Sequence, residues 1–491
     1  MFKYLFFDDQ RLFARENLVR KYGTPELIED AFYRDPNVDM NLSGSCVFKC
    51  PDGKYHMIYH GIGDDTNAGG IGNVACDATG KRKRRAFVCA AVSDDGIHFT
   101  PRMTGADSCA GTPEFPNSVS DATWDLGELG CVVEDRKAPA EERYKALMVT
   151  SFKDDEFRHR DYLMASPDLI HWHKMPGTWH QVGTEPIVSC FYNKCYDNFT
   201  IICRPDCGER RVGYAETSDF KTFTAPLHCL QVDSLDQPLD ELYGMPAFEY
   251  DNWYIGFPYL YGGQPHKNWW KGAEGTMHCE LSYSLNGKNF QRSLRTPFIC
   301  GWDQQTIDKF GKVCPIVWPN WMLRKEDGSI LIYAQIIPRD HGWLMKSTGE
   351  SALAVYRLRE DGFICLASER DKTARLATRE NIWHGGELTV NIRCSAPATV
   401  AVLRPDVQAQ TCRPIEGFSH EDCAAFCGDN CRWVPEWKGG KLDSLKGRNL
   451  VFEICFGGGE LYSLSGDCTP VMFVEARKHE LFGTLPTRKG W

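Results

Sequence analysis

The chain has 491 residues, of which 42% are hydrophobic and 25% charged, and its formal net charge is −10. These values are ordinary for globular domains, and they exclude a chain that is mainly disordered, collagen-like or coiled-coil. The acidic balance, with KRKRR at 81–85 as the only basic run, argues against a nucleic-acid partner. No apolar run approaches the roughly 18 residues of a membrane-spanning helix, so we expect no membrane partner.

The N-terminal segment MFKYLFFDDQRLFARE does not have the pattern of a secretory signal. Its apolar stretch is short and is followed at once by Asp8 and Asp9. The 22 cysteines lie mostly in apolar, strand-like segments such as VSCFYNKC and FEICF, which is typical of reduced core thiols. We therefore expect a cytoplasmic protein.

A repeated turn organises the first 370 residues. Each copy is a short strand followed by a bend of the type Ser-x-Asp-Gly and then an aromatic residue, as in VSDDGIHF. The Asp or Asn side chain caps such a bend, Gly supplies the positive φ, and the aromatic side chain returns to the core. Five copies, the last of them degenerate, end at Phe99, Trp172, Phe223, Phe290 and Phe363.

Two further β-rich segments precede each turn, so each repeat predicts an antiparallel meander of about four strands. Five such repeats predict a five-bladed β-propeller over residues 1–370. The alternative, a large irregular β-sandwich, would not repeat one turn chemistry five times.

The pattern changes after residue 370. Segments such as ELTVNIRCS and LVFEICFG alternate polar and apolar residues, and no sixth turn of this type follows. We expect a β-sandwich over residues 371–475 and a terminal tail over 476–491. The fold class is therefore all-β, a five-bladed β-propeller followed by a C-terminal β-sandwich.

Several phrases resemble the family 32 and family 43 type glycoside hydrolases, and among them an uncharacterised bacterial branch. The phrases are GKYHMIYH in the first repeat, RRVGYAETSDFKTF in the third and RPIEGFSHEDC in the C-terminal part. The resemblance extends over nearly the whole chain. It implies a glycoside hydrolase that cleaves a short oligosaccharide or glycoside with two carboxyl groups in the axial pocket of the propeller.

The resembled families place catalytic carboxyl groups just before the inner strand of a blade. Glu185, before the third inner strand, matches their general acid. Glu128, or else Asp125, matches the carboxylate of the second blade.

The first blade departs from the family pattern. The matching position falls near Ser43, where no carboxylate stands, and Asp39 is the nearest acid upstream. The phrase RDPN at 34–37 is similar to the fructosidase Asp-Pro-Asn phrase but lies several residues too early.

The fourth and fifth repeats supply replacement carboxylates, Glu241 and Asp303. Aromatic and basic side chains near the same loops are suited to stacking on, or hydrogen bonding with, a sugar. These candidate substrate-binding residues are Trp124, Tyr243, Trp270, Trp302 and Arg204.

We expect no cofactor and assign no metal ligand. Acids from several blades would also suit a divalent metal ion, so a metal-assisted carbohydrate hydrolase or deacetylase is one alternative. A non-catalytic carbohydrate-binding propeller is the other. The expected partner is a small carbohydrate, and a homo-oligomer formed through the sandwich stays open.

Overall fold

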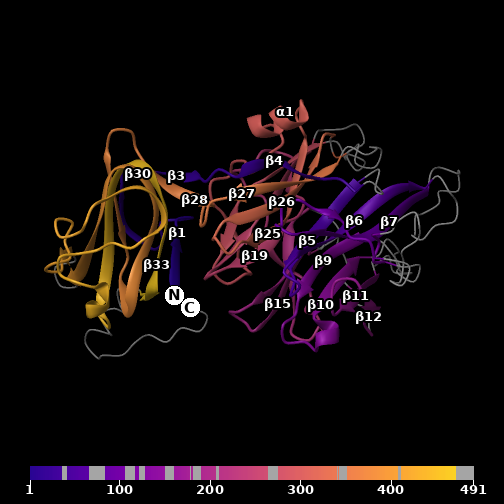
Figure 1. The fold of residues 1–491 in the computed structure, drawn as a ribbon, viewed down its shortest axis with the longest axis horizontal. Coiled ribbons are helices and arrows are strands. Elements are labelled where there is room, and N and C mark those ends of the chain that lie inside the picture. Colours follow the sequence, from indigo (N-terminus) through magenta and orange to yellow (C-terminus); the bar gives the residue numbers. More distant parts are fainter. Residues whose placement is uncertain are drawn as a thin grey trace. The chain divides into compact units, whose positions relative to one another are not determined.

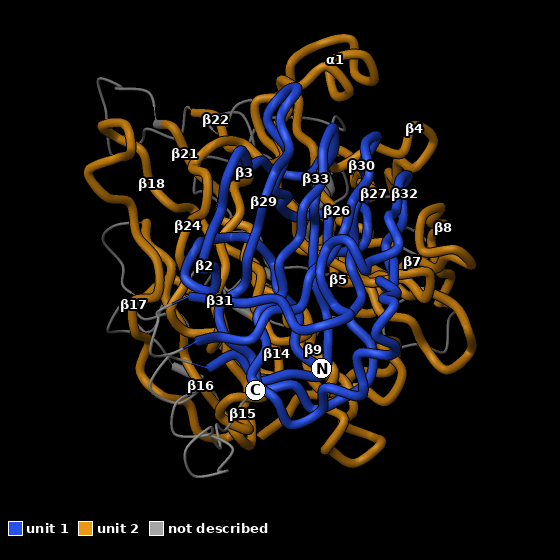
Figure 2. The backbone as a smooth tube through the Cα atoms, turned by 90° about the vertical axis from the view of Figure 1, so that its left-hand side faces the viewer, with its two compact units in different colours: residues 1–24, 358–491 blue, residues 25–357 orange. Residues whose placement is uncertain are grey.

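The computed structural model describes residues 1–35, 41–65, 83–104, 117–120, 128–149, 160–176, 179–180, 189–205, 210–263, 275–339, 341, 351–406 and 411–471. These residues form mainly strands and turns, which confirms the all-β class. Within these ranges, no helix has the length and apolar character needed to cross a membrane. The chain divides into two compact units: unit 1 is Met1–Thr24 with Leu358–Trp491, and unit 2 is Pro25–Arg357 (Figure 2).

The described part of unit 2 contains four separate sheets of four or five strands (Figure 1). The first comprises β5 (Asn41–Lys49), β6 (Tyr55–Asp65), β7 (Lys83–Ser93) and β8 (Thr100–Pro101). The second comprises β9 (Glu128–Glu134), β10 (Tyr144–Val149), β11 (Arg160–Ser166), β12 (His173–Lys174) and β13 (Trp179–His180), with the 3-10 turn η1 (Ala140–Glu142) before β10. The third comprises β14 (Ser189–Asn193), β15 (Asn198–Cys203), β16 (Val212–Thr217) and β17 (Leu227–Leu230). The fourth comprises β19 (Ala247–Tyr250), β20 (Trp253–Gly256), β23 (Ser282–Ser284) and β24 (Gln291–Arg292).

A further sheet of unit 2 has seven strands. In spatial order these are β18 (Asp240–Leu242), β21 (Tyr259–Gly263), β22 (Gly275–Cys279), β25 (Ile316–Arg324), β26 (Ile330–Ile337), β27 (Ala352–Leu358) and β4 (Glu26–Tyr33). The helix α1 (Gln304–Phe310) lies beside β4 (Figure 1).

The first strand of each of the four separate sheets and β25 of the seven-stranded sheet are arranged in a circle. β5 lies beside β9, β9 beside β14, β14 beside β19, and β25 beside β5. Trp321 of β25 connects the two ends of this series, because its ring centroid lies 5.5 Å from that of Phe248 in β19 and 5.1 Å from that of Phe48 in β5. Sheets placed around such a circle give the propeller-like arrangement expected from the repeats.

The expected count of five separate blades is not confirmed. Four sheets are separate blades, and they correspond to the first four repeats. The strands of the fifth repeat, β25 to β27, belong to the seven-stranded sheet, because a parallel pairing of Met277 with Ile316 joins them to β22.

Four of the predicted turns share one hydrogen-bond pattern. In the first, Ser93 Oγ accepts from the Gly96 N–H at 2.9 Å, and Asp95 Oδ1 accepts from the N–H groups of Ile97 and His98 at 2.7 and 2.8 Å. The pattern recurs at Ser166–His171, Thr217–Thr222 and Ser284–Asn289. The fourth residue of each turn has positive φ: Gly96 (77°), Leu169 (70°), Phe220 (53°) and Gly287 (71°). A hydroxyl and a carboxylate or amide two positions apart therefore specify the bend, even where the fourth residue is not Gly.

The fifth predicted turn, which ends at Phe363, does not have this pattern. Arg359 stands where the other turns have Ser or Thr, so no hydroxyl is present to cap the bend. The positive φ falls at Asp361 (58°), and the carboxylate of Asp361 binds Lys3 at 2.7 Å. This segment lies in unit 1.

Unit 1 is built on a nine-stranded sheet that includes both ends of the described chain. From the N-terminal part come β1 (Phe2–Leu5), β2 (Leu12–Glu16) and β3 (Leu18–Tyr22). From the C-terminal part come β28 (Ile364–Ser368), β29 (Thr373–Thr378), β30 (Asn381–Asp406), β31 (Thr411–Pro414), β32 (Phe426–Trp433) and β33 (Asn449–Pro470), with the 3-10 turn η4 (Leu442–Leu445) before β33.

The division of the chain differs from the expected domains 1–370 and 371–475. Residues 1–24 belong to unit 1, because β1 pairs with β33, β2 with β29 and β3 with β28. Pairing between strands more than 300 positions apart leaves no local signal, so the sequence pattern assigned the N-terminus to the propeller.

Candidate functional site

Half of the predicted site residues cannot be placed by their side chains. Asp39, Trp124, Glu185 and Trp270 lie outside the described residues. Glu128 is the first residue of β9, and its side chain also lies outside the described part.

Three predicted residues come together in unit 2: Arg204, Glu241 and Tyr243. Glu241 lies in β18, Tyr243 follows this strand, and Arg204 follows β15. Arg204 Nη2 donates to the main-chain oxygen of Tyr243 at 3.4 Å, and its guanidinium carbon lies 5.7 Å from the centroid of the Tyr243 ring. These predicted residues therefore come from two different sheets, and the fold brings them into contact.

Arg210, which the sequence analysis did not select, completes a charged pair in the same place. Its Nη1 lies 2.5 Å from Oε2 of Glu241, and the two side chains are 29% and 33% exposed. Its guanidinium carbon lies 5.3 Å from the ring centroid of Tyr243 and 4.9 Å from that of Tyr261. The main-chain oxygen of Arg210 also accepts from the Leu242 N–H at 3.2 Å, which connects the segment before β16 to β18.

Two further residues contact Tyr243: Trp318 in β25 of the seven-stranded sheet, and His341, which follows β26. The Trp318 ring is stacked on the Tyr243 ring at 5.9 Å between centroids, with 18° between the planes. His341 Nε2 shares a hydrogen bond with the Tyr243 hydroxyl at 3.1 Å, and its ring also packs against Tyr261 at 5.4 Å. These residues have no local spacing in the sequence that connects them with Tyr243.

We call this group the Tyr243 cluster. Its members are Arg204, Arg210, Glu241, Tyr243, Tyr261, Trp318 and His341. All except the buried Tyr261 are half-buried, so they remain accessible to a ligand. Aromatic faces bind apolar surfaces, while a guanidinium–carboxylate pair offers charged donors and acceptors in a fixed geometry. That combination suits a polar ligand with apolar faces, such as a sugar.

The cluster lies where strands end. Cys203 pairs with Gly213, so the end of β15 lies beside the start of β16. Ile316 pairs with Ile337, so the start of β25 lies beside the end of β26, after which His341 follows. Residues at strand ends are held by the sheets while their side chains remain open to solution.

The structure gives Asp303 a different, local role. Its Oδ1 accepts from the Thr306 N–H at 2.8 Å and caps the N-terminus of α1. Trp302 is 38% exposed and packs edge-on against His278 at 5.5 Å. These two predicted residues have contacts of their own, outside the Tyr243 cluster.

Asp35, in the RDPN phrase, is a buried carboxylate that lies two residues after the end of β4 and is 3% exposed. The Tyr59 hydroxyl and, at 2.8 Å, the Asn117 amide both donate to its Oδ2. Tyr33 and Tyr59 share a further hydrogen bond of 2.8 Å. Burial first, and then nearby groups that include Asp35, raise the pKa of Tyr59 well above its ordinary value. The phrase is expected to lie too early for the site, and in the structure Asp35 accepts hydrogen bonds from Tyr59 and Asn117.

Comparisons with known proteins give only distant likenesses. No family model matches the sequence, and no curated protein matches it. Among solved structures, a beta-1,2-mannobiose phosphorylase from Listeria innocua is 11% identical, with a TM-score of 0.43 over 71% of this chain and 98% of that chain. A family 130 structure described with beta-1,2 mannosidic linkages in Candida mannan is 13% identical, with a TM-score of 0.41 over 69% and 94%. An N-acetylgalactosamine deacetylase from F. plautii is 12% identical, with a TM-score of 0.39 over 70% and 95%.

These solved structures are phosphorylases, glycoside hydrolases and a deacetylase, and the named family is 130 rather than 32 or 43. The function must therefore be inferred from the chain's own residues.

Proposed function

We propose that the chain is a carbohydrate-active enzyme, a glycoside hydrolase acting on a short oligosaccharide or glycoside, and that the Tyr243 cluster binds its substrate. The observation that carries this proposal is the half-buried Arg210–Glu241 pair, which lies against the rings of Tyr243 and Tyr261. A sugar ring needs an apolar contact for its C–H face and charged partners for its hydroxyl groups, and the cluster supplies both.

The proposed roles follow from the contacts. Arg210 binds Oε2 of Glu241, which fixes the carboxylate and leaves Oε1 to accept hydrogen bonds from sugar hydroxyl groups. Trp318 stacks on the Tyr243 ring and His341 holds its hydroxyl, so the ring is fixed before a ligand arrives. A site with fixed side chains loses less conformational entropy on binding.

Hydrolysis of a glycosidic bond also requires a proton donor and a second carboxyl group. We keep Glu185 as the proposed acid, because it precedes β14 and the start of β14 lies beside the end of β15 that leads to Arg204. The second carboxyl group comes from Glu241, Glu128 or Asp39. In this proposal β25 to β27 with β4 form the fifth blade. The reaction needs no cofactor, and the protein binds its small carbohydrate substrate in the cytoplasm.

The test is a glycoside-hydrolysis screen of the wild-type chain, followed by variants on any substrate found. Glu185→Gln should lower kcat by roughly 10²–10⁴-fold, the usual contribution of general acid catalysis. Glu241→Gln should lower kcat/KM by at least tenfold, because the substrate loses a charged acceptor.

Glu249→Gln is the matched control. Glu249 pairs with Lys194 and its side chain is 30% exposed, close to the 33% of Glu241, but it lies in β19 outside the cluster. It should keep wild-type kinetics. Full activity of both Glu185→Gln and Glu241→Gln, or a wild-type chain without turnover of any glycoside, would overturn the proposal.

A phosphorylase is the second candidate, because two guanidinium groups, Arg204 and Arg210, flank one tyrosine ring. Such an arrangement suits an anionic co-substrate. Inorganic phosphate should then accelerate cleavage and yield a sugar phosphate, whereas a hydrolase releases the free sugar whether or not phosphate is present. A deacetylase would instead release acetate from an N-acetylated sugar.

A further inference from the structure

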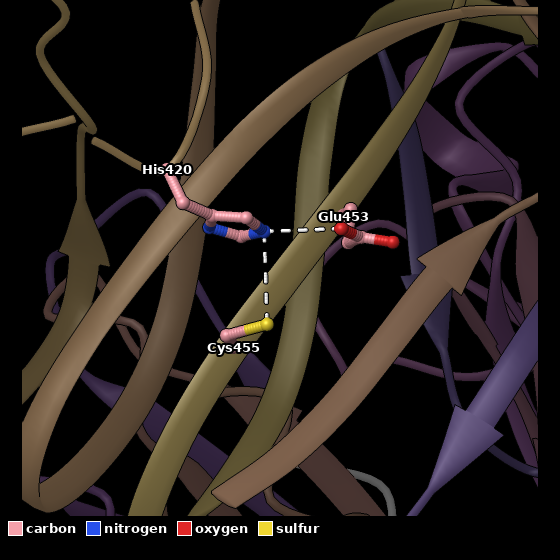
Figure 3. Close-up of side chains that lie close together, drawn as sticks. All are labelled: His420, Glu453 and Cys455. Carbon is pink, nitrogen blue, oxygen red and sulfur yellow. Dashed lines mark hydrogen bonds and ion pairs between the residues drawn. The ribbon is translucent and has the colours of Figure 1, made fainter. Parts of the chain in front are cut away.

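Three side chains with different donor atoms converge in unit 1. Glu453 and Cys455 are two positions apart on β33, so they lie on the same face of the strand. His420 comes from the segment between β31 and β32, and its imidazole points toward both of them (Figure 3). All three residues are partly exposed, so the group can be reached from solution.

Two of the donor–donor distances are close to those in a zinc ligand set. His420 Nε2 lies 3.1 Å from Oε1 of Glu453 and 3.6 Å from Sγ of Cys455, and all three donor atoms lie within 4.8 Å of one another. Donor atoms around a tetrahedral zinc ion lie about 3.3–3.8 Å apart, since the bonds are about 2.0–2.3 Å long. Small side-chain movements would therefore place one zinc ion between them.

The arrangement does not fit a nucleophilic triad. In a triad, one ring nitrogen contacts the nucleophile and the other contacts the orienting carboxylate. Here both Glu453 and Cys455 face the same nitrogen, Nε2. Metal coordination requires donor atoms that converge on one point, whereas a triad requires contacts on opposite sides of the imidazole ring.

The surrounding contacts orient the donors. His420 Nδ1 lies 2.9 Å from Oγ1 of Thr399, so a proton on Nδ1 can be donated to the hydroxyl while Nε2 keeps its lone pair. The two oxygens of Glu453 are divided between partners: Oε2 accepts from Arg375 Nε at 2.8 Å, and Oε1 faces His420. Such outer contacts fix ligand orientation in metal sites.

Arg375 forms ion pairs with two carboxylates, Glu453 and Glu16. Its Nη1 lies 2.7 Å from Oε1 of Glu16, so a second carboxylate offsets the charge next to the donor set.

We propose that His420 Nε2, Glu453 Oε1 and Cys455 Sγ bind a zinc ion, with water in the fourth position. Imidazole, carboxylate and thiolate are the ligand types of zinc sites, and three protein ligands leave a coordination position open. Binding displaces the thiol proton of Cys455 and any proton on Nε2, and no oxidation or reduction is involved.

The experiment uses the full chain, reduced and stripped of metal with a chelator. Zn²⁺ is titrated in competition with a chromogenic chelator, and Co²⁺ serves as a spectroscopic probe of thiolate ligation. The wild type should bind a single zinc ion that the Cys455→Ser and His420→Ala variants lose, and it should show a thiolate-to-cobalt absorption band that both variants lack.

Cys427→Ser and His384→Ala are the matched controls. Cys427 is an exposed thiol, and His384 is a half-buried imidazole bonded to Thr469 at 2.7 Å; neither belongs to the proposed site. Both variants should keep the zinc ion and the band. The proposal is overturned if Cys455→Ser binds zinc as well as the wild type does, or if the wild type shows no cobalt band. The His420–Glu453 contact would then be an ion pair only. If a variant fails to fold, absence of the cobalt band in the wild type still overturns the proposal, and retention of the band in Cys427→Ser excludes that exposed thiol as its source.

Discussion

Lys3 Nζ lies 2.7 Å from Oδ1 of Asp361, a residue 358 positions further along the chain, and both side chains are buried. Oδ2 of Asp361 accepts from the Ser463 hydroxyl at 2.5 Å. The pair therefore ties the N-terminal strand β1 to two distant segments of unit 1. A buried charge that loses its partner is left with an uncompensated desolvation cost.

We expect the Lys3→Met variant to lose about 3–5 kcal/mol in the free energy of unfolding of unit 1, the usual cost of removing one member of a buried pair. Denaturant unfolding of the full chain, followed by a probe within unit 1, measures this loss. Lys372→Met removes an exposed partner of Glu369 in the same unit and should cost about 0–1 kcal/mol. Equal effects of the two substitutions would show that the Lys3–Asp361 pair does not stabilise the unit.

The contrast between this pair and the repeated turns shows what the sequence could predict. The bend at Ser166 forms from hydrogen bonds that span three residues, so its pattern is visible in the sequence. The same pattern misassigned Asp361, because a long-range partner, Lys3, takes its carboxylate and Arg359 replaces the capping hydroxyl. Local chemistry identified four turns, and a non-local contact overrode the fifth.

The turn carboxylates should make the propeller sensitive to acid. Burial alone would raise the pKa of Asp168, but hydrogen bonds from the His171 N–H and ring and from the Ile170 N–H outweigh it and lower the pKa. A lowered pKa contributes stability that is present above the unfolded value of about 3.9 and is lost as the pH falls through the folded value.

Asp168→Asn tests this contribution. Asn286 forms the fourth turn with an amide oxygen that accepts both N–H groups at 3.0 Å, so asparagine should support the bend at Asp168 too. We expect the variant to be less stable than the wild type at pH 7 and to differ less from it at pH 3. Urea unfolding at both pH values measures the difference, and a gap that widens on acidification would contradict the expectation.

The candidate site shows the same limit on sequence reasoning. Glu241 and Tyr243 were selected because they precede the predicted inner strand of a repeat, and position along one repeat is a local signal. Trp318 lies in β25, Arg210 just before β16 and His341 after β26, and only the fold places them beside Tyr243. A pattern that indicates one residue of a site does not indicate the neighbours supplied by distant segments.

Tyr243→Phe separates the ring of Tyr243 from its hydroxyl. The variant keeps the stacking on Trp318 but loses the hydrogen bond to His341. On a confirmed substrate we expect KM to rise by up to about tenfold, since such a bond contributes about 0.5–1.5 kcal/mol. Tyr243→Ala, which removes the stacking surface as well, should raise KM further.

Tyr196→Phe is the control for Tyr243, because Tyr196 is an exposed tyrosine near Lys288 rather than near the cluster. Its kinetics should match those of the wild type. Unchanged KM in Tyr243→Ala would exclude the cluster from substrate binding.

His60 in β6 should give the propeller a second, separate pH dependence. It is 2% exposed, and its Nε2 has no hydrogen-bond partner among the described residues. Its partners across the sheet are Ser43 in β5 and Val88 in β7, and Ile58 lies two positions before it on the same face. Burial lowers the pKa of His60 to about 4.

The unfolded chain binds a proton at His60 near pH 6.5, whereas the folded chain does so only near pH 4. Between these values the unfolded state holds more protons, so stability falls as the pH falls, by up to about 3 kcal/mol across the window. His60→Leu replaces the imidazole with an apolar side chain of similar size and removes the titrating group. The unfolding free energy of this variant should therefore change less between pH 7 and pH 5 than that of the wild type. His173→Asn, at an exposed histidine of the same unit, should leave the wild-type dependence intact.

The pH window of His60 lies above the one in which the turn carboxylates titrate, so urea unfolding at pH 7, 5 and 3 separates the two effects. If His60→Leu keeps the wild-type pH dependence, the loss of stability between pH 7 and pH 5 comes from other groups.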